Sequence, residues 1–236
     1  MNPNLETRSQ TRTTAAFTLI ELLVVIAVIG VLAGLIFPIT KGLKTTRIKR
    51  VASAELSQME TAIQNYKSKL GYFPPDNPAG TLTTTVPNQI FFELGGATVD
   101  NATSTFISLN GKDRITLANL GTATGSAVTG IANSSTSAGG TDDKAGPLDF
   151  LKDSQLKPGQ VADWTVNGVN LRSLVCSAGW TGSIASSPSG STLTPWQYRS
   201  TSPVNNRGTF DLWVDIYLDG KTNRFSNWSK TPQIVP

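Results

Sequence analysis

The sequence predicts an α+β fold in which a long N-terminal helix packs on a C-terminal antiparallel β-sheet. Three observations carry this prediction: an apolar run at 17–38, a helical pattern that continues to residue 71, and alternating apolar residues at 209–218. The chain has 236 residues. About 165 of them follow the helix, which is enough for one modest domain.

The apolar run, FTLIELLVVIAVIGVLAGLIFP, is long enough to cross a bilayer as one helix. It contains a single carboxylate, Glu21. An acid at the centre of a membrane helix costs about 2.5–3.5 kcal/mol and marks a functional site by default. We therefore expect a positive charge at the start of the helix to compensate Glu21. Thr18 and Glu21 also fit a capping box, which is compatible with that role.

Three further residues of the run have predicted structural roles. Gly30 and Gly34 match the small-xxx-small pattern that lets two helices approach closely, so they form a candidate contact face. Pro38 lacks an N–H and is predicted to kink the helix where it leaves the bilayer.

After Pro38 the apolar residues keep a helical period, which predicts an amphipathic half of the helix at 39–71. Gly71 and the following Pro74-Pro75 should end it. The stripe is expected to pack on the chain's own sheet, with charged residues such as Glu55 on the other positions. It comprises Ile48, Val51, Ala52, Leu56, Met59, Ile63, Tyr66 and Leu70.

The segment 78–147 is rich in Thr, Gly, Ser and Asn, and it predicts a loop-rich region with one or two short helices. Strand signals follow it. Asn167-Gly168 between apolar runs predicts a hairpin, residues 209–218 alternate as a strand, and Asp219-Gly220 predicts the turn that closes it.

The composition excludes several classes of function. The chain contains no histidine, which removes His-based catalytic triads and His-ligated zinc sites. Its single cysteine, Cys176, cannot form an internal disulfide and is predicted to be a small buried strand residue. The net charge of +4 comes without aromatic and basic residues interleaved, so no nucleic-acid partner is expected. The chain is predicted not to be an enzyme.

The FTLIE sequence behind a short polar leader resembles the prepilin signature of the type IV pilin superfamily, which includes the pseudopilins of type II secretion. The resemblance implies a pilin-like ladle fold. It also implies cleavage between Ala16 and Phe17, N-methylation of Phe17, and pairing of Glu21 with the Phe17 amine of its own or a neighbouring subunit. One departure is Ala16, because the family mostly has glycine before the cut.

The C-terminal region resembles that of major pseudopilins, in which the corresponding pieces enclose a calcium-binding loop. The matching pieces are Phe210-Asp211-Leu212, Asp219-Gly220 and Asn227-Trp228. Here the loop carries Lys221 and Arg224 where acids are needed, so we expect the calcium site to be lost or much weakened. Asp219 is the one possible ligand carried over, and no other cofactor is expected. Asp211, Asp215 and Asp219 are expected to form a solvated strand face, because residues four apart on a strand are about 13 Å apart.

The resemblance implies a structural subunit of a type II secretion pseudopilus. The implied partners are other copies in a homo-oligomeric filament, minor pseudopilins, the prepilin peptidase, the inner-membrane assembly platform and membrane lipid. One alternative is a type IV pilin for adhesion, motility or DNA uptake. Another is a membrane-tethered periplasmic binding module.

The implied location is the bacterial inner membrane, crossed once. The leader 1–16 would be cytoplasmic, 17–38 would span the bilayer, and the head 72–236 would be periplasmic. Basic residues work against this orientation, because the positive-inside rule favours placing the more basic flank in the cytoplasm. The prepilin motif is more specific than this bias, and we follow it. The basic residues after the run are Lys41, Lys44, Arg47, Lys49 and Arg50.

Overall fold

The structure, a computed structural model, describes seven segments of the chain and groups the residues into two compact units, 1–44 and 45–236. At 35–42 only the helical backbone is described. The described segments are 18–76, 88–125, 128–136, 146–152, 156–157, 159–178 and 193–235.

The first unit contains the N-terminal part of helix α1, which runs from Leu19 to Leu70. Its apolar side chains are exposed from Leu19 to Leu32. Within the part of the chain that the structure describes, no helix has an apolar stretch long enough to cross a membrane. The span predicted at 17–38 includes residues whose side chains lie outside the described set, and it stays a prediction. The kink predicted at Pro38 likewise stays a prediction.

The second unit begins with the rest of α1, whose predicted apolar stripe is confirmed. Ile48, Ala52, Met59, Ile63 and Tyr66 are buried, and Val51, Leu56 and Leu70 are half-buried. The helix ends as predicted at Gly71, where φ is +87°. The Gly71 N–H donates to the Lys67 carbonyl oxygen at 2.9 Å.

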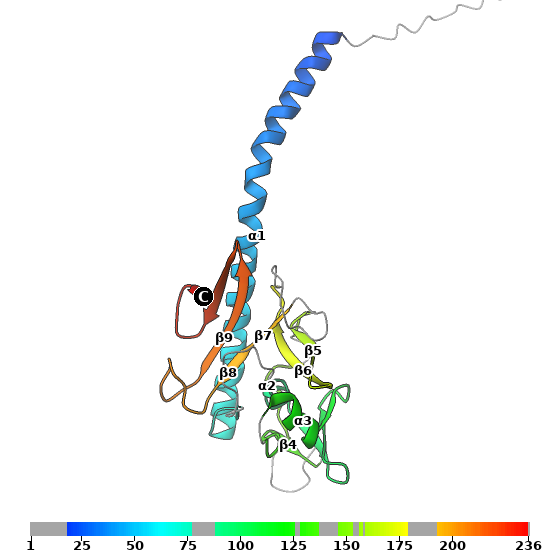
Figure 1. The fold of residues 1–236 in the computed structure, drawn as a ribbon, viewed down its shortest axis with the longest axis vertical. Coiled ribbons are helices and arrows are strands. Elements are labelled where there is room, and N and C mark those ends of the chain that lie inside the picture. Colours follow the sequence, from blue (N-terminus) through cyan, green and yellow to red (C-terminus); the bar gives the residue numbers. More distant parts are fainter. Residues whose placement is uncertain are drawn as a thin grey trace, which may run out of the picture. The chain divides into compact units, whose positions relative to one another are not determined.

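The predicted C-terminal sheet is present and lies beside the second half of α1 (Figure 1). Its turn at Asp219-Gly220 has φ values of +50° and +79°, as a two-residue type I′ turn requires. Leu212, Val214 and Ile216 belong to the same core cluster as the buried face of α1. The antiparallel order is β11-β10-β9-β8, with β8 at Gln197–Arg199, β9 at Asp211–Leu218, β10 at Lys221–Ser226 and β11 at Gln233–Val235.

A second sheet contains the other predicted hairpin. It comprises β5 (Val161–Val166), β6 (Val169–Cys176) and β7 (Thr194–Pro195). Asn167 and Gly168 join β5 to β6 with φ values of +52° and +78°, again a type I′ turn. Cys176 is buried at the end of β6, as predicted.

The described part of the segment 78–147 contains the two short helices that the sequence predicted, α2 (Ile90–Gly95) and α3 (Leu117–Thr124). A small sheet of order β3-β2-β1-β4 was not predicted. Its strands are β1 (Ala97–Asp100), β2 (Thr105–Ser108), β3 (Arg114–Thr116) and β4 (Ser134–Ser135).

Candidate assembly site

The start of α1 contains the predicted capping box. Thr18 N and Thr18 Oγ1 each donate to Glu21 Oε2 at 2.9 Å. In return, Glu21 N donates to Thr18 Oγ1 at 3.3 Å. The other carboxylate oxygen, Oε1, receives no hydrogen bond from the described residues. Glu21 is therefore held in place by one oxygen while the other can accept a further donor. Ala16 and Phe17 lie outside the described residues, so the predicted cleavage and the Glu21–Phe17 pair stay predictions.

The helix on both sides of Glu21 exposes large apolar side chains all around its axis. Exposed fractions range from 48% at Val25 to 82% at Leu19. An apolar surface of this extent marks contact with a membrane or with other protein chains. The exposed set is Leu19, Ile20, Leu22, Leu23, Val24, Val25, Ile26, Val28, Ile29, Val31 and Leu32.

Gly30 and Gly34 interrupt this surface. A Cβ atom added at either residue would meet no atom within 4 Å. The glycines are therefore not needed to fit any neighbour within the described chain. This leaves open the predicted use, in which a second helix packs against the bare backbone.

The turn between β9 and β10 places the residue proposed as a calcium ligand. Asp219 Oδ2 accepts a hydrogen bond from Thr45 Oγ1 at 3.1 Å. Asp215 is engaged by Arg224, whose Nε and Nη2 both lie 2.8 Å from its oxygens. Residues 221–226 form strand β10 rather than a loop. Calcium takes six to eight oxygen ligands. No group of three His, Cys, Asp or Glu suited to a metal occurs among the described residues. The loss or weakening of the calcium site at Asp219 stays a prediction.

The prediction that Asp211 lies on a solvated strand face is wrong. It is buried, at 2% exposure. Its Oδ2 accepts hydrogen bonds from Val204 N at 2.8 Å and Asn205 N at 2.9 Å, and its Oδ1 accepts one from Asn206 N at 2.8 Å. The loop before β9 wraps around the carboxylate and removes it from water.

The predicted position of Glu55 is also wrong. We expected it on the polar side of α1, but it is 3% exposed. Its carboxylate accepts hydrogen bonds from Ser177 N at 3.1 Å and from Ser177 Oγ. This contact ties α1 to the residue that follows β6, next to Cys176. Burial raises the pKa of the Cys176 thiol, and the nearby Glu55 charge adds to the effect.

Glu93 in α2 is a further buried carboxylate that the sequence did not reveal. It is fully buried. Oε1 accepts from Gln89 Nε2 and Ala132 N, both at 2.9 Å, and Oε2 accepts from the Tyr66 hydroxyl at 3.0 Å and Asn133 N at 3.1 Å. Burial raises the pKa of Glu93, and these four donors oppose the shift without cancelling it.

Asp76, just after the end of α1, has the same kind of contact. Its Oδ2 accepts hydrogen bonds from Ser200 N and Thr201 N, both at 2.9 Å. Nearby, the Tyr198 hydroxyl donates to the Pro74 carbonyl oxygen at 2.9 Å. The segment after the helix is thus bound to the loop that follows β8. No signal in the sequence pattern distinguishes these acids from solvent-exposed ones.

Comparison with known proteins agrees with the features at the start of α1. Residues 11–37 match the model of the prokaryotic N-terminal methylation motif. The match includes Ala16, Phe17, Glu21, Gly30 and Gly34. The chain therefore carries the N-terminal methylation motif of type IV pilin-like proteins.

A relative with an established name is the type II secretion system core protein G of Escherichia coli strain K12. It is 39% identical over 61 residues, which are 26% of this chain and 42% of that protein. The match thus spans less than half of the relative's length. No solved structure matches the chain.

Proposed function

We propose that the chain is a structural subunit of a type II secretion pseudopilus, processed by a prepilin peptidase and assembled from the inner membrane. The observation that carries the proposal is Glu21 at the start of an exposed apolar helix, a carboxylate with one oxygen that accepts no hydrogen bond from any described residue. The match to the methylation motif and the similarity to core protein G support it. The similarity also favours a secretion pseudopilus over a type IV pilin for adhesion, motility or DNA uptake.

In this proposal the peptidase cuts between Ala16 and Phe17 and leaves a new N-terminal amine. The Glu21 oxygen Oε1 then accepts a hydrogen bond from the Phe17 amine of the same or a neighbouring subunit. Pairing removes the cost of an uncompensated carboxylate among apolar groups, which is about 2.5–3.5 kcal/mol at a helix centre. The geometry suits this step because Thr18 holds the other oxygen without neutralising its charge.

The rest of the exposed helix supplies the packing surface. Before assembly its apolar side chains are covered by lipid, and after assembly they contact the helices of other copies. Gly30 and Gly34 let these helices approach closely. The head, 72–236, stays in the periplasm. Other implied partners are minor pseudopilins and the inner-membrane assembly platform.

The proposal is tested by expressing the chain with the secretion genes of its host. Mass spectrometry of the mature protein should find an N-terminus at methylated Phe17. Glu21→Ala should insert in the membrane normally but form no filaments. Asp163→Ala, which removes an exposed carboxylate of the head, is the matched control and should assemble normally.

An intact Met1, or unchanged filaments from Glu21→Ala, would contradict the proposal. The two filament systems separate by function. Deleting the gene should abolish export of a secreted enzyme and leave surface pili unaffected. The reverse result would favour the type IV pilin, and loss of neither would favour a membrane-tethered periplasmic binding module.

A further inference from the structure

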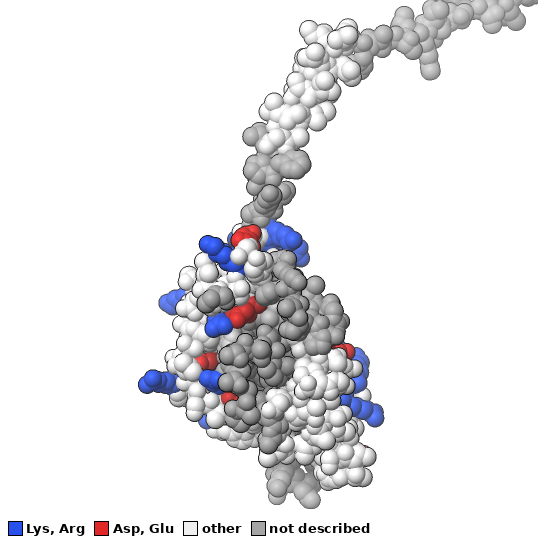
Figure 2. Space-filling view, in the orientation of Figure 1, with Lys and Arg blue, Asp and Glu red and all other residues white. Residues whose placement is uncertain are grey.

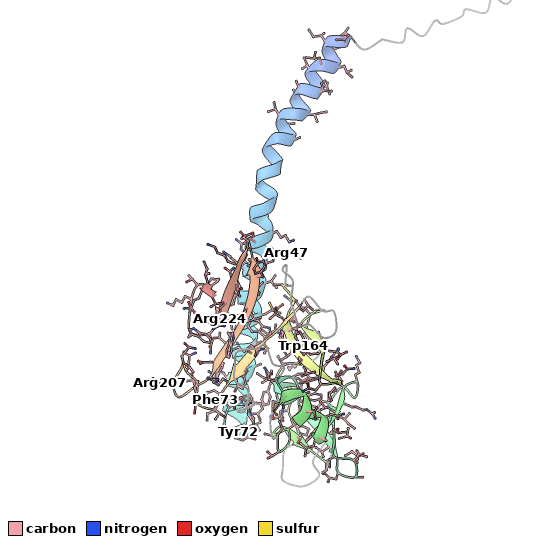
Figure 3. All side chains as sticks on the ribbon, viewed as in Figure 1. Arg47, Tyr72, Phe73, Trp164, Arg207 and Arg224 are labelled. Atoms are coloured by element: carbon pink, nitrogen blue, oxygen red, sulfur yellow. The ribbon has the colours of Figure 1, made fainter. Side chains whose placement is uncertain are left out.

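Basic side chains gather on α1 near the beginning of the second unit. Figure 2 shows them at this end of the unit, and Figure 3 places Arg47 near the tip of the hairpin formed by β9 and β10. We call Arg47, Lys49 and Arg50 the basic collar. All three are exposed. None forms an ion pair or hydrogen bond with any residue that the structure describes.

The collar lies on the side of the helix opposite the one that packs on the head. Successive helical residues are rotated by about 100°. Relative to Arg47, the side chains of Lys49 and Arg50 therefore leave the axis at about 200° and 300°. The buried Ile48 leaves it at about 100°. The three cations thus spread over about half of the helix surface, and Ile48 lies in the middle of the other half.

This arrangement leaves the three cations accessible to a partner outside the head. The proposed membrane helix makes the bilayer surface the nearest such partner. If 17–38 spans the bilayer, Arg47 lies about 14 Å and Arg50 about 18 Å beyond its end along the axis. These distances are within about two Debye lengths of the headgroups at physiological salt.

We propose that the basic collar binds the phosphate groups of anionic phospholipids at the periplasmic face of the inner membrane. The inference rests on the proposed function, because it needs the helix to span the bilayer. Each Lys or Arg near an anionic membrane surface raises the affinity of a protein for that surface about fivefold. The positive-inside rule disfavours cations on the periplasmic side of the membrane. The collar is positively charged in spite of this bias.

The test uses the purified full chain reconstituted in vesicles of phosphatidylcholine alone or mixed with phosphatidylglycerol. Flotation in a density gradient first reports insertion. Lipid that co-purifies after solubilisation is then quantified by mass spectrometry. The wild type should enrich phosphatidylglycerol over phosphatidylcholine, and the enrichment should fall between about 50 mM and about 500 mM NaCl.

The decisive variant is Arg47→Gln with Lys49→Gln and Arg50→Gln, which should lose at least about tenfold of the enrichment. Its unfolding midpoint should match that of the wild type, because all three side chains are exposed. The matched control is a variant of the same charge in which three exposed cations elsewhere are replaced. It should enrich phosphatidylglycerol as the wild type does. The control substitutions are Lys112→Gln, Arg207→Gln and Lys230→Gln.

Several outcomes overturn the collar as a lipid site. These are equal enrichment in the wild type and the collar variant, no enrichment in the wild type, or loss of self-association by the collar variant in lipid-free detergent. The last outcome would assign the collar to a contact between copies. If the wild type fails to float with phosphatidylcholine vesicles, the result contradicts the proposed function as well as the lipid site. If it floats but enriches no phosphatidylglycerol, the result contradicts the lipid site alone.

Discussion

Asp211→Asn should lower the free energy of unfolding by about 2 kcal/mol, although it changes no more than one side-chain oxygen into an NH₂ group. In the wild type, Oδ2 accepts from Val204 N and Asn205 N, and Oδ1 accepts from Asn206 N. The best placement of the amide keeps its oxygen at the Oδ2 position. Its NH₂ group then faces the Asn206 N–H, and one buried donor loses its acceptor, at a cost of about 1–3 kcal/mol. The remaining hydrogen bonds are also weaker, because their acceptor is no longer charged. In the opposite direction, the neutral side chain costs less free energy to bury. The figure of about 2 kcal/mol is the balance of these effects.

The assay is urea unfolding of the full chain in detergent, followed by tryptophan fluorescence. One of the five tryptophans, Trp213, lies two residues after Asp211 in β9. The midpoint should fall by about 1 M at an unchanged slope. Asp163→Asn is the control, because that side chain is 60% exposed and its ion pair with Arg172 lies at the surface. It should change stability by less than about 0.5 kcal/mol. If both variants unfold at the same urea concentration, the desolvation argument for the loop fails.

Two further predictions follow from the head. Burial raises the pKa of Glu93 above its ordinary value of 4.5, so the folded state holds this proton more tightly than the unfolded chain does. The contribution of Glu93 to the free energy of unfolding should therefore fall as the pH rises above about 4.5, and Glu93→Gln should remove this pH dependence. Urea midpoints of both proteins measured across this pH range check the prediction. Parallel pH profiles of the wild type and the variant would contradict it. Gly220→Ala forces a Cβ onto a backbone with φ of +79° and should cost about 1 kcal/mol. Gly95→Ala is the control and should be nearly neutral, because a Cβ there meets no atom within 4 Å and φ is not positive. Thermal unfolding of both variants measures the difference, and equal midpoints would contradict the prediction.

The parts of the fold that local patterns determine were predictable. Three- and four-residue spacing identified the buried face of α1, and Gly71 marked its end. Asn167-Gly168 and Asp219-Gly220 identified two turns, because few residues other than Asn, Asp and Gly adopt positive φ at both positions. Strands β1 to β4 were missed because two to four residues are too short to show a period of two.

The buried acids could not be predicted for a different reason. A pattern analysis assigns Glu55 and Asp211 to solvent because they are charged. Their burial depends on backbone donors supplied by other segments, and for Glu55 the donor is Ser177, 122 residues away. At the candidate assembly site the situation is reversed. Thr18 and Glu21 are three residues apart, and their hydrogen bonds follow from the sequence itself.

Three acids of the head also affect how freely its loops can change. Asp76, Glu93 and Asp211 each accept hydrogen bonds from at least two main-chain N–H groups of another loop segment. Every amino acid except proline supplies that donor. Many different side chains can therefore occupy the anchored loop positions while the anchoring bonds remain. A protein with such loops can alter its outer surface over evolution and keep the same internal framework.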